Sequence, residues 1–233
     1  MPRRFAIGDI HGCLKTFRSL VEETIQLNRD DQLYLIGDFI DRGPDSRGVL
    51  DYIISLMNNG YFLQAVRGNH EEMLLESVSD ERFLAGWLYN GAETTLNSFG
   101  IDTGLFITID SVKEIQPGYI DLLSALPYYI ELKDYIIVHA GINFYIKKPY
   151  DDLQALVWSR DMQYDYEKSS GRTVIHGHTP VSIDTIKQQV SQSEPGLINI
   201  DGGCVYSNHP DLGNLVALNL DTRELLYLQN LDN

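Results

Sequence analysis

The sequence predicts an α/β fold in which β-sheets are flanked by helices. Over the first 66 residues, short apolar runs alternate with segments whose apolar side chains recur at helical spacing. This alternation is typical of right-handed βαβ units and of a largely parallel sheet. The chain has 233 residues, 43% of them hydrophobic, which is enough for one α/β domain with a full core.

The first elements follow from the apolar pattern. Strands are expected at residues 5–7, 33–36 and 61–66. A helix with an apolar stripe from Leu14 to Ile25 joins the first two strands. Ser46 can cap a second helix, and Asn58-Asn59-Gly60 ends it. The first third of the chain therefore reads as three strands joined by two helices.

The middle of the chain, residues 71–126, is expected to be a helical insertion, with helices near 71–88, 92–99 and 117–126. Strands then return, and the tail reads as a β-meander. The later strands are expected at residues 128–132, 135–138, 173–175, 197–200, 215–220 and 224–228. No internal repeat and no Pro/Ser-rich linker divides the sequence, so we expect a single domain over residues 1–233.

Charge and composition exclude several functional classes. The sequence has 18 Lys and Arg against 33 Asp and Glu, a net charge of −15, which disfavours general binding of nucleic acids. It has no apolar run of about 20 residues and no basic cluster, so no membrane association is expected. Two cysteines are too few for a disulfide framework, and no signal-like leader is present, so a cytoplasmic protein is expected.

Five polar clusters stand where predicted strands end, the place where ligands of open α/β sheets bind. They are residues 8–12, 37–43, 68–71, 139–141 and 176–179, and they contain five of the six histidines. Any one cluster alone is typical of a turn. Together, imidazole and carboxylate groups that converge in space suit zinc, iron or manganese, so the sequence predicts a metal site.

These clusters resemble the motifs of the calcineurin-like metallophosphoesterases. The resemblance is to the phosphoprotein phosphatase family, with its bacterial serine/threonine protein phosphatases and the related diadenosine tetraphosphatases. That family is identified by Gly-Asp-X-His-Gly, Gly-Asp-X-X-Asp-Arg-Gly, Gly-Asn-His-Glu, a histidine with a glycine two residues on, and a late Gly-His. All five occur here in the same order between Asp9 and His178, over about three quarters of the chain. The resemblance implies the calcineurin-like metallophosphoesterase fold.

The resemblance further implies a centre of two divalent or trivalent metal ions. Manganese is expected, with iron and zinc as alternatives, because mixed donors of this kind accept all three. A water bridging the ions becomes hydroxide near neutral pH and would attack phosphorus. The implied ligands are Asp9 and His11 on one ion, Asn69, His139 and His178 on the other, and Asp38 as the bridge between them.

Four other residues acquire roles through the same resemblance. His70 would be the general acid that protonates the leaving oxygen, and Asp41 would orient it. Arg42 would bind phosphate oxygens through its planar guanidinium. Arg160, in Trp158-Ser159-Arg160, resembles a second phosphate-binding arginine, although its motif is short and a solvated loop arginine is the alternative.

Several neighbouring residues are expected to be structural. Trp87 is expected in the core of the helical insertion. His176 is expected to support the site without binding metal. Asp201-Gly202-Gly203 is expected to form a turn near the site, and His209 to lie in a loop.

The motifs leave the substrate open. The leading hypothesis is a metal-dependent phosphoprotein phosphatase that hydrolyses phosphoserine and phosphothreonine monoesters. The alternative is a diadenosine tetraphosphatase-like hydrolase of dinucleoside polyphosphates, which would use the same metals and arginines. A non-catalytic phosphate-binding module is the third hypothesis, but it should lack a ligand or the acid, and none is missing here. The expected partner is therefore a phosphorylated protein or a small phosphorylated substrate.

Overall fold

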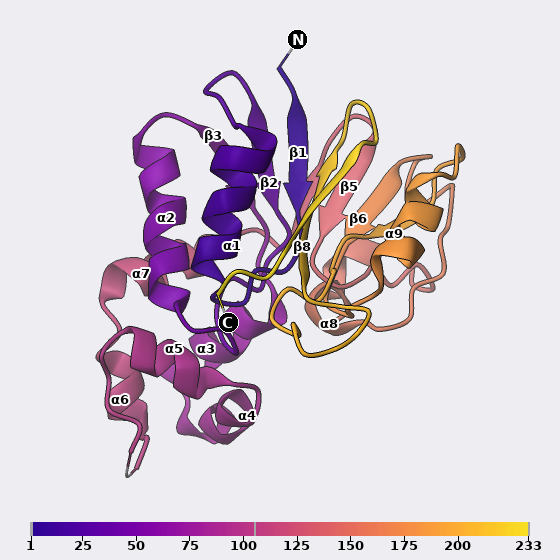
Figure 1. Cartoon of the computed structure of the whole chain (residues 1–233). Coiled ribbons are helices and arrows are strands. Elements are labelled where there is room, and N and C mark those ends of the chain that lie inside the picture. The colour runs from indigo at the N-terminus through magenta and orange to yellow at the C-terminus, as the bar shows by residue number, and fades with distance from the viewer. Residues whose placement is uncertain (1, 105, 233) are drawn as a thin grey trace.

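The computed structural model describes residues 2–104 and 106–232, which fold into two β-sheets with helices around them (Figure 1). The sheets pack against each other through an apolar core. Ala6 and Val216 of the first sheet meet Ile137 and Ile175 of the second in that core, and all four are buried. The predicted α/β class, with sheets flanked by helices, is confirmed.

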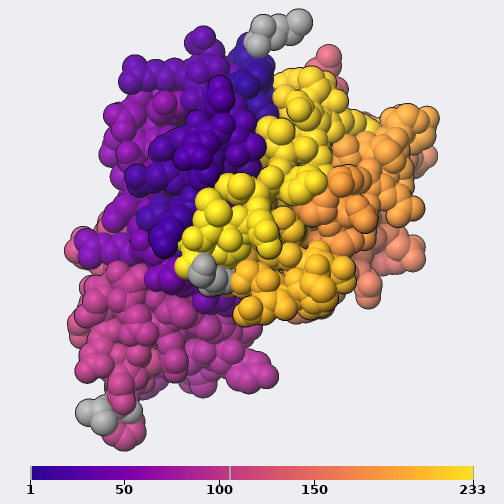
Figure 2. All heavy atoms as spheres, in the orientation of Figure 1, coloured from indigo at the N-terminus to yellow at the C-terminus, as the bar shows by residue number. Residues whose placement is uncertain are grey.

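The first sheet has the strand order β3-β2-β1-β8-β9. Its strands are β1 (Arg4–Ile7), β2 (Gln32–Leu35), β3 (Phe62–Ala65), β8 (Asn214–Asn219) and β9 (Leu225–Gln229). The first three are parallel, as the βαβ pattern predicts, whereas β8 runs antiparallel to β1 and to β9. Figure 2 shows the consequence on the surface, where the C-terminal segment (yellow) lies between the N-terminal part (indigo) and the segment that precedes it in the chain (orange).

The second sheet has the order β4-β5-β6-β7. Its strands are β4 (Tyr129–Glu131), β5 (Tyr135–Val138), β6 (Thr173–His176) and β7 (Leu197–Asn199). Strands β5, β6 and β7 are parallel. Because β7 pairs with β6 while β8 and β9 belong to the other sheet, the tail is not one β-meander, and that prediction is wrong. Within the tail, β8 and β9 pair antiparallel as a hairpin.

Helices flank both sheets. Beside the first sheet lie α1 (Leu14–Ser19), which continues as a π-helical segment (Leu20–Ile25), and α2 (Ser46–Asn58) (Figure 1). Beside the second lie α8 (Leu153–Trp158), whose Leu156 packs in one cluster with Ile136 and Val174, and α9 (Ile183–Val190).

The cap of α2 differs from the prediction. Asp45, not Ser46, is the capping residue, because its carboxylate accepts a hydrogen bond from the Gly48 N–H at 2.8 Å. Ser46 is the first helical residue, and its hydroxyl accepts a hydrogen bond from the Asp41 N–H instead.

Residues 69–124 are mostly helical. Figure 1 shows α4, α5 and α6 gathered at one end of the molecule, below α2. The helix α6 has no counterpart in the sequence prediction. The segment contains α3 (Asn69–Ser79), a 3₁₀ turn (Glu81–Phe83), α4 (Leu84–Tyr89), α5 (Ala92–Ser98), α6 (Ile109–Lys113) and α7 (Pro117–Ser124).

Candidate metal centre

The loops that follow β1, β2, β3, β5 and β6 bring the six expected metal ligands together. Two groups of donors form, and Asp38 belongs to both. His11, Asp38 and His70 make one group, and Asp38, His139 and His178 make the other, with the ligand atoms of each group within 4.8 Å of one another. The six expected ligands are Asp9, His11, Asp38, Asn69 and His139, which are buried, and His178, which is half-buried.

In the second group, hydrogen-bond acceptor atoms face one another without a donor between them. The Nδ1 atom of His139 lies 2.9 Å from the Ile36 carbonyl oxygen, which can only accept, so Nδ1 carries the hydrogen. Burial lowers the pKa of His139, so the ring is neutral and Nε2 has a lone pair. That atom lies 2.9 Å from Oδ1 of Asn69 and 3.4 Å from Oδ1 of Asp38. Three acceptor atoms therefore face one another, an arrangement that a cation stabilises.

The first group differs in one respect, because Nη1 of Arg42 donates to Nε2 of His11 at 2.8 Å. Nδ1 of His11 lies 2.9 Å from the Ile40 carbonyl, so its lone pair is also at Nε2, which is 3.5 Å from Oδ2 of Asp38. Asp9 accepts the His178 N–H at one oxygen (3.1 Å), whereas its buried Oδ1 has no hydrogen-bond partner among the described residues. Each group therefore offers three donors to a cation and Asp38 belongs to both, whereas Asp9 lies in neither group and His70 takes its place in the first.

Buried negative charge accumulates at the same place. Burial, together with Asp201 and Asp38, raises the pKa of Asp9 well above its usual value. Burial also raises the pKa of Asp201 to about 7. Bound cations would stabilise the ionised forms of these carboxyl groups.

Asp201 was expected only as part of a turn. It does make that turn, because its Oδ1 accepts the Gly203 N–H at 2.9 Å. It also places a buried carboxylate beside Asp9. The signal in the sequence was its position after β7, which matches the position of the ligand clusters after their strands.

Glu71 joins two of the ligand loops, a role that the sequence did not reveal. Its Oε2 accepts the backbone N–H groups of Asp38 (2.8 Å) and Gly68 (2.9 Å), and its Oε1 accepts that of Phe39 (2.8 Å). Burial and the charge of Asp38 raise the pKa of Glu71 to about 7, while these N–H groups favour the carboxylate. The side chain thereby ties the loop of Asp38 to the loop that begins α3.

The backbone of the centre is strained. Among the described residues, eight non-glycine residues have positive φ, and five of them belong to the site. Such conformations persist where the surrounding structure holds them, and they concentrate at functional sites. The five are His11, Asp38, Asp41, Arg42 and His178, with φ between 47° and 71°.

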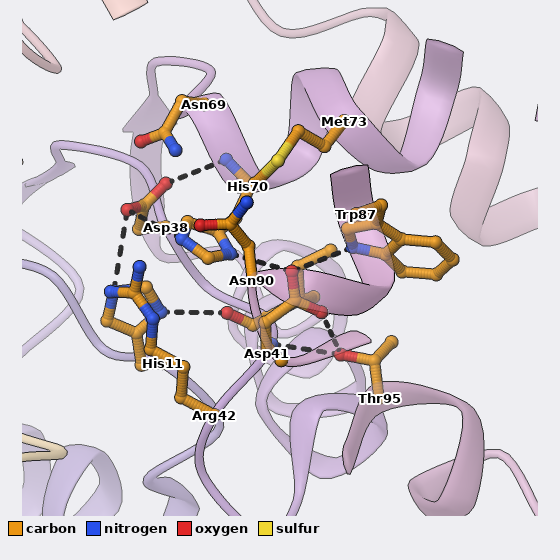
Figure 3. A network of polar contacts seen from close by, with 12 residues as sticks. His11, Asp38, Asp41, Arg42, Asn69, His70, Met73, Trp87, Asn90 and Thr95 are labelled. Atoms are coloured by element: carbon orange, nitrogen blue, oxygen red, sulfur yellow. Dashed lines mark hydrogen bonds and ion pairs between the residues drawn. The ribbon is translucent and has the colours of Figure 1, made fainter. Parts of the chain in front are cut away.

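His70 and Asp41 form a buried pair next to this centre (Figure 3). Nδ1 of His70 lies 2.7 Å from Oδ2 of Asp41, while its Nε2 has no hydrogen-bond partner in the described part of the chain and lies 4.0 Å from Oδ2 of Asp38. Burial lowers the pKa of His70, but Asp38 and the bond with Asp41 outweigh it, so the pKa is raised overall. The ring is thus held at one nitrogen and has a free nitrogen at the centre.

One of the two expected arginines contacts the centre directly. Nη1 of Arg42 lies 2.8 Å from Nε2 of His11. Arg160 is exposed, and its charge contributes to the low pKa of His178, which burial and His139 bring to about 3. His176 lies outside both donor groups, and burial lowers its pKa to about 4.

The sequence is similar to that of proteins whose family is known. The model of the calcineurin-like phosphoesterase family matches residues 3–217. Serine/threonine-protein phosphatase 1 of Salmonella typhimurium is 29% identical over 185 residues, 76% of this chain and 78% of that protein. The asymmetrical bis(5'-nucleosyl)-tetraphosphatase PrpE of Oceanobacillus iheyensis is 27% identical over 229 residues, 87% of this chain and 84% of that protein.

Solved structures show the same fold. A putative diadenosine tetraphosphatase has a TM-score of 0.62 at 21% identity and covers all of this chain, with 97% of its own length matched. A serine/threonine phosphatase of Saccharomyces cerevisiae has a TM-score of 0.61 at 13% identity, with 98% of this chain and 79% of that chain matched. No helix within residues 2–104 and 106–232 is long and apolar enough to span a membrane.

Proposed function

The chain belongs to the calcineurin-like phosphoesterases, and from that premise we propose that it is a metal-dependent phosphatase acting on phosphoserine and phosphothreonine of proteins. The mutually facing acceptor atoms of His139, Asn69 and Asp38 carry the metal-dependent part of the proposal. The pair of His70 and Asp41 supports a phosphomonoester as the substrate.

Two metal ions would be held by the six ligands that the loops bring together. When bound, they supply Lewis-acid activation of the attacking water and neutralise phosphate charge. Manganese is the proposed metal, with iron and zinc as alternatives, since carboxylate, amide and imidazole donors accept all three. Asp9, His11 and Asp38 would hold one ion, and Asp38, Asn69, His139 and His178 the other.

The arginines would bind and orient the phosphate group. Arg42 contacts His11 of the first donor group, and the charge of Arg160 acts on His178 of the second, so we assign both arginines to phosphate binding. Their positive charge faces a centre that is otherwise rich in carboxylates. The substrate phosphate would therefore be held in place before the reaction.

His70 would donate the proton that the leaving oxygen needs. Asp41 holds Nδ1, which leaves the Nε2–H of the protonated ring available for transfer. The alkoxide of serine or threonine is a far stronger base than the phosphate released from an anhydride, so it depends more on a proton donor. A buried and oriented acid therefore favours a phosphomonoester substrate.

Dinucleoside polyphosphates are the second candidate. Relatives named as asymmetrical tetraphosphatases align with 86% to 91% of this chain. The guanidinium of Arg42 also lies 5.8 Å from the ring centroid of Tyr206, a partly exposed side chain that could stack on a nucleobase.

A comparison of rates decides between the two. The manganese-loaded protein would be given a phosphothreonine peptide and diadenosine tetraphosphate at matched concentrations, and kcat/KM would be measured for each. The proposal expects a large preference for the peptide. A large preference for the dinucleotide would establish the second candidate instead.

The proposed compartment is the cytoplasm. Cys13 and Cys204 are both free and buried, which fits a reducing environment.

A further inference from the structure

We propose that Trp87 and Thr95, in the helical segment between β3 and β4, are positioning residues for the acid pair of His70 and Asp41. In this role they determine how well the enzyme protonates poor leaving groups. The inference rests on the proposed function, in which His70 is the general acid.

The carboxylate of Asp41 is held from both sides (Figure 3). Its Oδ2 accepts the Trp87 Nε1–H at 2.8 Å and lies 2.7 Å from Nδ1 of His70. Its Oδ1 accepts the Thr95 hydroxyl at 2.5 Å. Asp41, Trp87 and Thr95 are all fully buried, so water cannot replace either bond without rearrangement of the core.

The backbone of Asp41 is tied to the same helices. Its N–H points at Oγ of Thr95 (2.9 Å) and Oγ of Ser46 (3.0 Å), and its φ of 70° is a strained conformation. The next N–H, that of Arg42, donates to the Gly91 carbonyl at 3.3 Å. One threonine hydroxyl thus contacts both the main chain and the side chain of Asp41.

Trp87 therefore does more than fill the core. Its indole N–H needs a partner when buried, and the partner here is the carboxylate that orients His70. Without the two donors, Asp41 would be free to rotate about its side-chain bonds. The imidazole would then lose the fixed direction in which its Nε2 faces the centre.

Leaving groups of different basicity separate this role from a general effect on stability. Proton donation matters most for a basic leaving oxygen and little for an acidic one. A misplaced acid should therefore slow phenyl phosphate hydrolysis strongly and 2,4-dinitrophenyl phosphate hydrolysis weakly. A loss of folded protein would lower both rates by the same factor.

The test uses Trp87→Phe and Thr95→Val in the manganese-loaded full chain. We expect kcat for phenyl phosphate to fall by about 10- to 100-fold and kcat for dinitrophenyl phosphate by less than about threefold, as for partial loss of general acid catalysis. Thr95→Ser keeps the hydroxyl and should restore most of the loss. Metal content by elemental analysis should stay at the wild-type value in all three variants.

A double-mutant cycle completes the test. In a His70→Asn background the leaving-group effect of Trp87→Phe and Thr95→Val should vanish, because the group they position is gone. Equal losses for both aryl phosphates, or an effect that persists without His70, would overturn the inference. The proposed function would still stand if His70→Asn alone caused a loss that depends on the leaving group. A wild-type chain that hydrolyses no aryl phosphate would overturn both.

Discussion

The Nε2 atom of His139 lies 2.9 Å from the Oδ1 atom of Asn69, although both are acceptors: the ring hydrogen is on Nδ1, which faces the Ile36 carbonyl, and Oδ1 is an amide oxygen. These residues are 70 positions apart and follow strands of different sheets. Their contact therefore links the two sheets at the point where the buried carboxylates and acceptor atoms need a positive charge. A cation at this point would stabilise both the site and the packing of the sheets.

Metal removal should accordingly lower thermal stability. A ligand at 100 times its dissociation constant stabilises a folded protein by about 2.7 kcal/mol. For a chain of this size, that corresponds to a shift in Tm of about 5 to 10 °C. Scanning fluorimetry of the manganese-loaded and chelator-treated protein measures the shift, and readdition of manganese should reverse it. An identical Tm in both states would contradict the two-metal assignment.

His70→Asn should separate the acid from the metal ligands. Because His70 would donate a proton rather than hold a metal, the variant should keep two metals per chain. Its kcat should fall on the order of 10²- to 10⁴-fold, as for a missing general acid. Elemental analysis and steady-state kinetics on one preparation test both statements. Collapse of the metal content would show that the residue has been given the wrong role.

Glu71→Gln should weaken metal binding without changing any ligand. The new amide would keep one acceptor oxygen and turn its NH2 group either toward the backbone N–H of Phe39 or toward those of Asp38 and Gly68, and a mismatch of this kind costs about 1–3 kcal/mol. We expect a loss of manganese affinity of about tenfold or more, measured by titration calorimetry.

The neighbouring residue provides the control for Glu71. Glu72 pairs with Arg67 at 2.8 Å at a partly exposed position away from the three N–H groups. Glu72→Gln should therefore leave manganese affinity within about twofold of wild type, since partly exposed ion pairs contribute little. Equal losses in the two variants would argue against a role for Glu71 in placing Asp38.

Metal affinity should rise with pH between about 5.5 and 7.5. The histidine ligands release few protons, because burial lowers the pKa of His11 and His139 and brings that of His178 to about 3. The carboxyl groups behave oppositely, since burial raises the pKa of Asp9 and brings that of Asp201 to about 7. Below pH 7 Asp201 holds a proton that a cation must displace, and the raised pKa of Asp9 acts in the same direction, so binding strengthens as the pH rises.

Manganese titrations at three pH values measure this linkage. The affinity should increase by up to about tenfold per pH unit for each proton released and should level off above pH 7. Asp201→Asn removes one of the titrating groups and should flatten the dependence. An affinity that falls with rising pH would mean that other groups control binding.

The sequence indicated which residues gather at the centre better than it indicated the arrangement of the sheets. The apolar runs indicated most strands because burial leaves a local pattern, and the motifs after them placed His11, Asp38 and His139 in one region. Strand pairing left no such local signal. The runs that became β7 and β8 are similar in composition, yet they entered different sheets, because partner choice depends on the packed faces of the whole fold.

The contacts of Trp87 and Thr95 with Asp41 could not be predicted from the sequence either. Each bond to Asp41 joins residues that are 46 or 54 positions apart. An aromatic residue in a helical pattern predicts burial but not the partner of its N–H. Asp201 and Glu71 had positions that pointed to the site, and only the three-dimensional structure shows what their carboxylates contact.

Anomalous diffraction from crystals grown with manganese tests the central claim most directly. The account predicts two manganese peaks about 3.5 to 4 Å apart, as in two-metal hydrolases, with Asp38 between them, His11 on one and His139 and His178 on the other. A single peak, or peaks without contact to Asp38, would contradict it.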